Sequence, residues 1–231
     1  MIIGISGKKY AGKTSAAVVL RDHLQSTGQY ATLLSLGKFV KLLREGEGLF
    51  AEKNGERVPV TPEEVEQFPA LKEQIRKDWQ ELGTDCVRAI DKNLWVEMSV
   101  LAIRAYFYWR PVQQANVLLH DVRFPNEIFG FDEEFDPLKN LYIRLLRDVS
   151  STGDILAEHR SETALDQFGD SFHYVLDNSL MSLQDKNQSI VDIYRFHTGD
   201  LSQFELEHAI SQRNGEVAIA ADTKSALASA A

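Results

Sequence analysis

The sequence predicts an α/β fold in which five parallel strands form one sheet with helices on both faces. Short apolar runs of strand length alternate with longer stretches of helical periodicity. A glycine-rich turn joins the first apolar run, residues 2–5, to a helical segment that fades near Gly28. Open parallel sheets bind ligands at the carboxyl ends of their strands, so we expect the functional residues there.

Each expected strand is an apolar run with turn residues or a carboxylate at its end. The five runs are 2–5, 31–36, 116–121, 141–146 and 174–176. The expected helices occupy 13–27, the long stretch 61–88 with an interruption near Pro69, 94–109 and 182–196, and a short basic helix or turn is expected at 37–44. The string Thr61-Pro62-Glu63-Glu64 has the composition of a capping box at a helix start.

Two segments do not fit this alternation. Residues 46–60 are glycine-rich and acidic, which predicts a loop or small flap inserted over the sheet. Residues 215–231 become alanine-rich and contain no aromatic side chain, which predicts a frayed tail.

Composition restricts the class of partner. The 231 residues carry a formal net charge of −9, which argues against a nucleic-acid or anionic-membrane surface. Cys86 is the single cysteine, so a disulfide framework is excluded. The first strand begins within two residues of Met1 and no apolar run is long enough to span a membrane, so we expect a cytoplasmic protein without a signal peptide. The expected partner is a small molecule, and a homodimer is left open.

The turn after the first strand matches the P-loop pattern, in which two glycines with four residues between them precede Lys and Thr. Gly7 and Gly12 allow backbone angles that point successive N–H groups at a phosphate, and the helix N-terminus adds its positive end. Lys13 is expected to reach the β- and γ-phosphates of ATP, and Thr14 to bind Mg²⁺. The expected ATP-binding residues are Gly7, Lys8, Ala11, Gly12, Lys13, Thr14 and Ser15.

A second cluster follows the strand at 116–121. Asp121 ends this strand at the position where P-loop proteins keep a carboxylate for the magnesium shell. A strand-end aspartate also commonly caps a helix, and this alternative stays open. Arg123 follows two residues later and is suited to binding a phosphate.

Four strings together resemble the deoxynucleoside monophosphate kinases of tailed bacteriophages. They are GKKYAGKT from Gly7, WQELGTDCVRAIDKNLW from Trp79, DVRFPNE from Asp121 and HRSETAL from His159. The resemblance spans roughly Met1 to Val191. It implies a three-layer P-loop kinase that uses ATP and Mg²⁺ to phosphorylate a deoxynucleoside 5′-monophosphate, located in the host cytoplasm if the chain is phage-encoded.

The resemblance also implies a layout and a set of residues. The kinase domain would occupy 1–200, with a helical monophosphate-binding insert at about 45–110 and a short lid at about 147–160, followed by an extension at 201–231. The implied catalytic residues are Lys13, Arg123, Arg147 and Arg160, and the implied metal-binding residues are Thr14 and Asp121. The expected acceptor-binding residues are Lys38, Lys41, Arg44, Trp79, Gln80, Asp85, Arg88 and Arg123. Trp79 is equally consistent with a core position, and Asp85 with Arg88 is equally consistent with a surface ion pair.

Two other functions fit the same motifs. A dephospho-coenzyme A type of kinase would transfer phosphate to a hydroxyl, and Asp121 would then serve as the base. A switch NTPase would bind nucleotide to control a partner. A monophosphate acceptor needs no base, and the chain has no recognisable Ser-His-Asp or Cys-His set. The segment 46–60 does not match the family pattern, so base specificity is left open.

Overall fold

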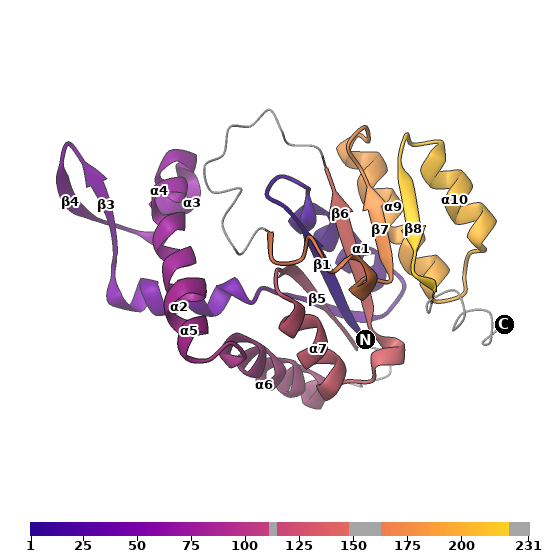
Figure 1. Cartoon of the computed structure of the whole chain (residues 1–231), viewed down its shortest axis with the longest axis horizontal. Helices are drawn as coiled ribbons and strands as arrows, with labels where there is room; N and C mark the ends of the chain where they lie inside the picture. Colours follow the sequence, from indigo (N-terminus) through magenta and orange to yellow (C-terminus); the bar gives the residue numbers. More distant parts are fainter. Residues whose placement is uncertain (111–114, 148–162, 222–231) are drawn as a thin grey trace.

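The fold is built on one six-stranded sheet in the order β2-β5-β1-β6-β7-β8 (Figure 1). This computed structural model describes residues 1–110, 115–147 and 163–221. The strands are β1 (Ile2–Gly7), β2 (Tyr30–Leu34), β5 (Ala115–Val122), β6 (Leu141–Leu146), β7 (Tyr174–Asp177) and β8 (Glu216–Ile219). The first five are mutually parallel where they pair, which confirms the five strands predicted from the sequence.

The sixth strand, β8, was not predicted and pairs antiparallel with β7. It lies in the segment that the composition predicted to be a frayed tail, so this prediction is wrong for residues 216–219. Val217 and Ile219 are half-buried against the core, while Glu216 and Ala218 are exposed. An alternation that contains two apolar side chains in four residues is too short to distinguish a strand from a polar turn.

Helices cover both faces of the sheet and make three layers. One face is covered by α1 (Lys13–Ser26), α9 (Leu183–His197) and α10 (Gln203–Ser211), and the other by α6 (Leu94–Trp109) and α7 (Pro125–Glu134). Each face has its own buried cluster, with Leu20 and Ile190 in the first and Ile103 and Phe131 in the second. This arrangement is compatible with the predicted three-layer α/β/α fold. Short 3₁₀ turns occupy η3 (Pro137–Lys139) and η5 (Gly169–Ser171).

The helices α7 and α10 were missed by the sequence analysis, although both carry capping signals. Pro125 stands at the first position of α7. Ser202 and Glu205 form a reciprocal capping box at the start of α10. Caps mark where a helix can begin, but neither helix has a long enough apolar stripe to be recognised by its periodicity.

The insert stands beside the sheet as a separate group of short elements (Figure 1). It contains α2 (Gly37–Glu47), the hairpin strands β3 (Leu49–Lys53) and β4 (Glu56–Val60), α3 (Pro62–Gln67), α4 (Pro69–Gln80), a π-helical turn η1 (Glu81–Cys86) and α5 (Val87–Ile90). Thr61 accepts a hydrogen bond from the Glu64 N–H and Glu64 returns one, so the predicted capping box is confirmed. The interruption predicted near Pro69 is also confirmed, since Phe68 is extended between α3 and α4.

Within the segment 46–60, residues 49–60 form a β-hairpin at the outer end of the insert, so the predicted position of this segment over the sheet is wrong (Figure 1). Asn54 and Gly55 both have positive φ (56° and 82°), as a two-residue hairpin turn requires. Leu49 is buried with Val65 and Ile75 in a small core of the insert itself. The hairpin thus packs on α3 and α4 because its apolar side chains have partners there.

Among the described residues, no helix is long and apolar enough to cross a bilayer. The predicted lid lies outside the described residues, except for Arg147.

Candidate functional site

A cavity of about 1270 Å³ lies between the carboxyl edge of the sheet and the insert. It is lined by the loop after β1, the start of α2, one side of α4 with η1, and the end of β5. Eight cationic side chains contribute to its lining against three carboxylates. The cations are Lys9, Lys13, Lys41, Lys72, Arg76, Lys77, Arg88 and Arg123, and the carboxylates are Glu73, Asp121 and Glu127. Although the chain has a formal charge of −9, cationic side chains outnumber carboxylates in this lining, which suits a polyanion.

The loop between β1 and α1 is shaped by residues with positive φ. Gly7 (φ 146°), Tyr10 (φ 67°) and Gly12 (φ 85°) turn the backbone back on itself before α1 begins at Lys13. A side chain at Gly7 would meet the Leu145 carbonyl oxygen at 2.7 Å from its Cβ, so the loop lies directly on β6. The Lys13 Nζ donates to the carbonyls of Gly7 (2.6 Å) and Lys8 (2.8 Å). The loop therefore presents an ammonium and a helix N-terminus to the same space, which is an arrangement suited to anions.

The other side of this loop is held by residues from the last part of the sheet. The buried Lys186 of α9 donates from Nζ to the Gly12 carbonyl (2.7 Å) and the Ser15 Oγ (2.6 Å). Asn178, after β7, donates from Nδ2 to the Ala11 carbonyl at 3.1 Å. The sequence analysis did not single out Lys186, because a lysine within an ordinary helical pattern gives no signal of burial.

Asp121 joins the end of β5 to the start of α2. Its carboxylate accepts hydrogen bonds from the Ser35 hydroxyl (2.6 Å) and from the N–H groups of Leu36 and Gly37 (both 2.9 Å). Asp121 thus accepts from backbone N–H groups at the start of α2, which is the helix-capping role that the sequence left open. Asp121 also lines the cavity together with the exposed Thr14. One hydroxyl and one carboxylate, completed by phosphate oxygens and water, are the ligands that Mg²⁺ commonly takes. No group of three or more His, Cys, Asp or Glu side chains in the described part of the chain forms a metal site of its own.

Arg123 lines the cavity beside a buried ion pair. Glu127 accepts hydrogen bonds from the backbone N–H groups of Arg123 (2.6 Å) and Phe124 (3.1 Å), and pairs with the Arg88 guanidinium. Burial raises the pKa of Glu127 to about 7, and the positive charge of Arg88 offsets part of that increase. The Arg88 guanidinium also lies 3.9 Å from the centroid of the Phe124 ring. Arg88, expected to bind the acceptor, thus fixes the backbone that carries Arg123, and Glu127 is a site residue that the sequence analysis missed.

The insert contributes the opposite wall through α2, α4 and η1. Lys41 Nζ lies 4.6 Å from the centroid of the Trp79 ring, and both residues line the cavity with Gln80. The Trp79 Nε1 is buried and has no hydrogen-bond acceptor among the described residues. The basic residues Lys72, Arg76 and Lys77 of α4 were not predicted as site residues. From the sequence alone, their helical spacing is typical of a solvent-exposed helix face. That face lines the cavity because of how the insert packs.

One ion pair connects the two walls. Lys9 of the loop donates to the Glu73 carboxylate of α4 at 2.8 Å, and Arg76 lies 4.0 Å from the same oxygen. Lys9 lies in the loop and Glu73 in the insert, so this ion pair is a direct contact between the two walls of the cavity.

Several residues expected at the site lie elsewhere. As far as the described residues delimit the cavity, its lining does not include Lys8, Lys38, Arg44, Asp85 or Arg147. Lys8 pairs with Asp166 at 3.0 Å, and Arg44 pairs with Glu47 at 2.8 Å. Arg147 Nη1 lies 3.5 Å from the Tyr10 carbonyl oxygen. Gly7 and Ala11 contribute to the fold of the loop, and Arg160 lies outside the described residues.

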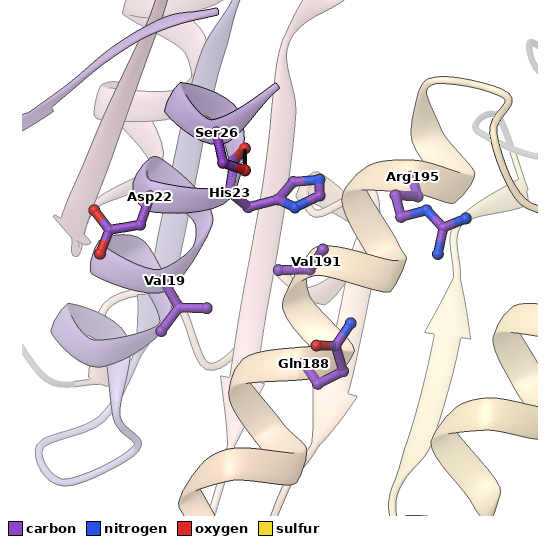
Figure 2. Close-up of a pocket in the computed structure, with 7 residues that line it drawn as sticks. All are labelled: Val19, Asp22, His23, Ser26, Gln188, Val191 and Arg195. Atoms are coloured by element: carbon purple, nitrogen blue, oxygen red, sulfur yellow. Dashed lines mark hydrogen bonds between the residues drawn. The ribbon is translucent and has the colours of Figure 1, made fainter. Parts of the chain in front are cut away.

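A second cavity, of about 420 Å³, lies between α1 and α9 (Figure 2). It shares no lining residue with the first cavity. Its lining residues are Val19, Asp22, His23, Ser26, Gln188, Val191 and Arg195. Figure 2 shows His23 reaching toward α9, whereas Asp22 points away from it. The polar side chains do not converge on one point, so we assign no ligand to this groove.

The comparisons with known proteins leave the family open. No protein-family model matches the chain. A stretch of 121 residues, 51% of this chain, is 33% identical to the "Uncharacterized protein ORF77" of Ictalurid herpesvirus 1 (strain Auburn), and the match spans 48% of that protein. The chain thus matches about half the length of this curated relative. A crystal structure of a "putative kinase" from Chloroflexus aurantiacus has a TM-score of 0.35 and 13% identity, with coverage of 92% of this chain and 75% of the other.

Proposed function

We propose that this protein transfers the γ-phosphate of ATP to a deoxynucleoside 5′-monophosphate, giving the diphosphate and ADP. The observation that carries the proposal is the single basic cavity with two different walls. One wall is the glycine loop with Lys13 and the strand end with Asp121 and Arg123, and the other is the basic side of α4. A donor polyphosphate on the first wall and an acceptor phosphate on the second would meet within this one cavity.

The size of the cavity supports two ligands. Pockets that hold a single small molecule usually measure about 300–1,000 Å³, and this cavity measures about 1270 Å³. Its positive charge is distributed over both walls, since Lys13 and Arg123 belong to the sheet edge while Lys72, Arg76 and Lys77 belong to the insert. A protein that bound one nucleotide as a switch would have no use for the second group of cations.

In this proposal the residues act by position and charge. Lys13, at the start of α1, binds the β- and γ-phosphates. Arg123 reaches from the donor wall to the acceptor phosphate, at the place where the two phosphates meet. Thr14 and, through water, Asp121 would hold Mg²⁺, which would supply charge neutralisation. Trp79 offers an aromatic face and a buried N–H donor to the acceptor's base or sugar. Catalysis then rests on alignment of the two anions and on neutralisation of the charge that develops between them.

No side chain is needed as a base in this reaction, because the acceptor is already an anion. The contacts of Asp121 fit that expectation. Its carboxylate accepts three hydrogen bonds, from the Ser35 hydroxyl and the N–H groups of Leu36 and Gly37, so both of its oxygens already act as acceptors within the fold. A kinase with a hydroxyl acceptor would need this group to remove a proton.

The proposal is tested by the release of ADP from Mg²⁺-ATP across a panel of acceptors. The panel contains each deoxynucleoside monophosphate, the matching nucleosides without the 5′-phosphate, the ribonucleotides and dephospho-coenzyme A. We expect turnover with at least one deoxynucleoside monophosphate and none with its nucleoside, since the basic cavity needs a phosphate to bind. Turnover with dephospho-coenzyme A alone, or ATP hydrolysis that no acceptor accelerates, would contradict the proposal.

A further inference from the structure

Lys186 is a buried lysine that does not itself line the cavity but contacts two loop residues that do, Gly12 and Ser15. It is 2% exposed, and its ammonium donates to the Gly12 carbonyl at 2.7 Å and the Ser15 hydroxyl at 2.6 Å. A Cβ on Gly12 would lie 2.4 Å from this nitrogen, so the loop and the lysine are in direct contact. The proposed reaction gives Lys186 no part. Burial of its charge is costly, and its hydrogen bonds to the loop offset part of that cost.

The contact of Lys186 holds the Gly12 carbonyl together with the Ala16 N–H, which donates to the same oxygen at 3.1 Å as α1 begins. In a planar trans peptide, the carbonyl and the following N–H point in opposite directions. A Gly12 carbonyl held toward Lys186 therefore directs the Lys13 N–H away from Lys186. Asn178 does the same for the preceding peptide, because it holds the Ala11 carbonyl at 3.1 Å. Two successive N–H groups at the start of α1 are thus aimed by side chains that do not line the cavity.

The charge on Lys186 is sensitive to its surroundings. Burial lowers its pKa to about 8, and the positive charge of Arg147 at the end of β6 contributes to the decrease. The other charged groups nearby are Lys13, one residue beyond Gly12, and Asp185 on its own helix, which pairs with Ser182. An anion bound to the loop brings negative charge close to this ammonium, and an adjacent opposite charge raises the pKa of an amine.

We propose that Lys186 is a positioning residue that holds the loop in its anion-binding form and takes up a proton when a nucleoside triphosphate binds. The inference rests on the proposed ATP site. Above pH 8 the free protein has lost this proton and the complex keeps it, so the complex must take the proton from solution. Linkage then requires the dissociation constant to rise with pH, by up to about tenfold per pH unit for one proton.

The test is calorimetric titration of Mg²⁺-ATP at pH 7.5 and pH 9, in buffers of different ionisation enthalpy. These pH values lie above the titration of the terminal phosphate, whose pKa is near 6–7. For the wild-type protein we expect proton uptake on binding at pH 9 and weaker binding than at pH 7.5. Lys186→Met should bind more weakly at pH 7.5, with no proton uptake. Lys186→Arg keeps a charge that does not titrate here, so it should bind more tightly than Lys186→Met and without the pH dependence.

Lys139→Met is the matched control, because this lysine is 75% exposed and pairs with Asp136 on the surface. It should bind and take up protons as the wild type does. ATP binding by the wild type without proton uptake at pH 9 would overturn the inference whether or not the variants fold, and would leave the proposed function standing. Equal pH dependence in the wild type and a folded Lys186→Met would also overturn it. Absence of ATP binding by the wild type at either pH would contradict the proposed function, and this inference with it.

Discussion

The two walls of the cavity differ in how they are held in place. The glycine loop lies on the central strand of the sheet and is fixed from behind by Lys186 and Asn178, beside a large core that includes Leu20. The insert has a small core of its own, whose buried members are Leu49, Val65 and Ile75. Small cores give low local stability, and low-stability elements are the ones that move on binding. We therefore assign the fixed wall to the donor nucleotide and the less stable wall to the acceptor.

The largest expected effect is on the fixed wall. Lys13→Ala should lower phosphotransfer by about a thousandfold, equivalent to about 4 kcal/mol, because a charge at the reacting phosphates is lost. The melting temperature should change little, since Lys13 is not part of the buried core. Turnover and thermal unfolding are compared with those of Lys139→Ala, a surface control. Turnover of Lys13→Ala near the wild-type value would contradict the assignment of the glycine loop as the binding site for the ATP phosphates.

A pair of core substitutions tests the difference in stability between the walls. Leu20→Ala should lower the free energy of unfolding of the whole domain by about 3 kcal/mol, because Leu20 is 0% exposed in the main core. Ile75→Ala, at a site 2% exposed in the insert, should instead speed amide hydrogen exchange within 49–80 and leave protection of β1 and β5 unchanged. Equal loss of protection in the sheet and the insert would show that the two walls unfold as one unit.

The smallest of these effects concerns acceptor binding. Arg76→Ala should raise the KM for the deoxynucleoside monophosphate by about thirtyfold, or about 2 kcal/mol, because a charged hydrogen bond to a phosphate is lost. The KM for ATP should stay within about twofold. Arg57→Ala is the control, since Arg57 is exposed on the hairpin with its guanidinium 4.6 Å from the centroid of the Phe50 ring. A rise in the KM for ATP as large as the rise for the acceptor would indicate that Arg76 binds the donor nucleotide.

The sequence predicted the fixed wall better than the insert wall for a physical reason. The glycine loop with its strand and helix is a local pattern, complete within Ile2–Ser26, so adjacent residues are enough to predict it. The basic side of α4 and the buried position of Lys186 depend on how distant elements pack, and neither residue spacing nor composition contains that information. The hairpin turn Asn54-Gly55 is a different case, because its signal is present in the sequence and was obscured by the acidic, glycine-rich surroundings.

Arg88 illustrates a further limit. Its place in a string that resembles a nucleotide-binding insert predicted a contact with the acceptor. The structure pairs it with Glu127, which lies 39 residues away in the chain, and Arg88 also lines the cavity, so its contact with the acceptor stays a prediction. Charged residues in a motif can act by fixing the backbone of another motif, and only the fold distinguishes the two roles.

The most direct test of two nucleotides in one cavity is the fate of a labelled γ-phosphate. Mg²⁺-ATP labelled at that position is incubated with the wild-type protein and each deoxynucleoside monophosphate, and the products are separated. The account predicts that the label appears in a deoxynucleoside diphosphate and that inorganic phosphate stays at its background level. Label found only in inorganic phosphate, at a rate that no acceptor changes, would contradict it.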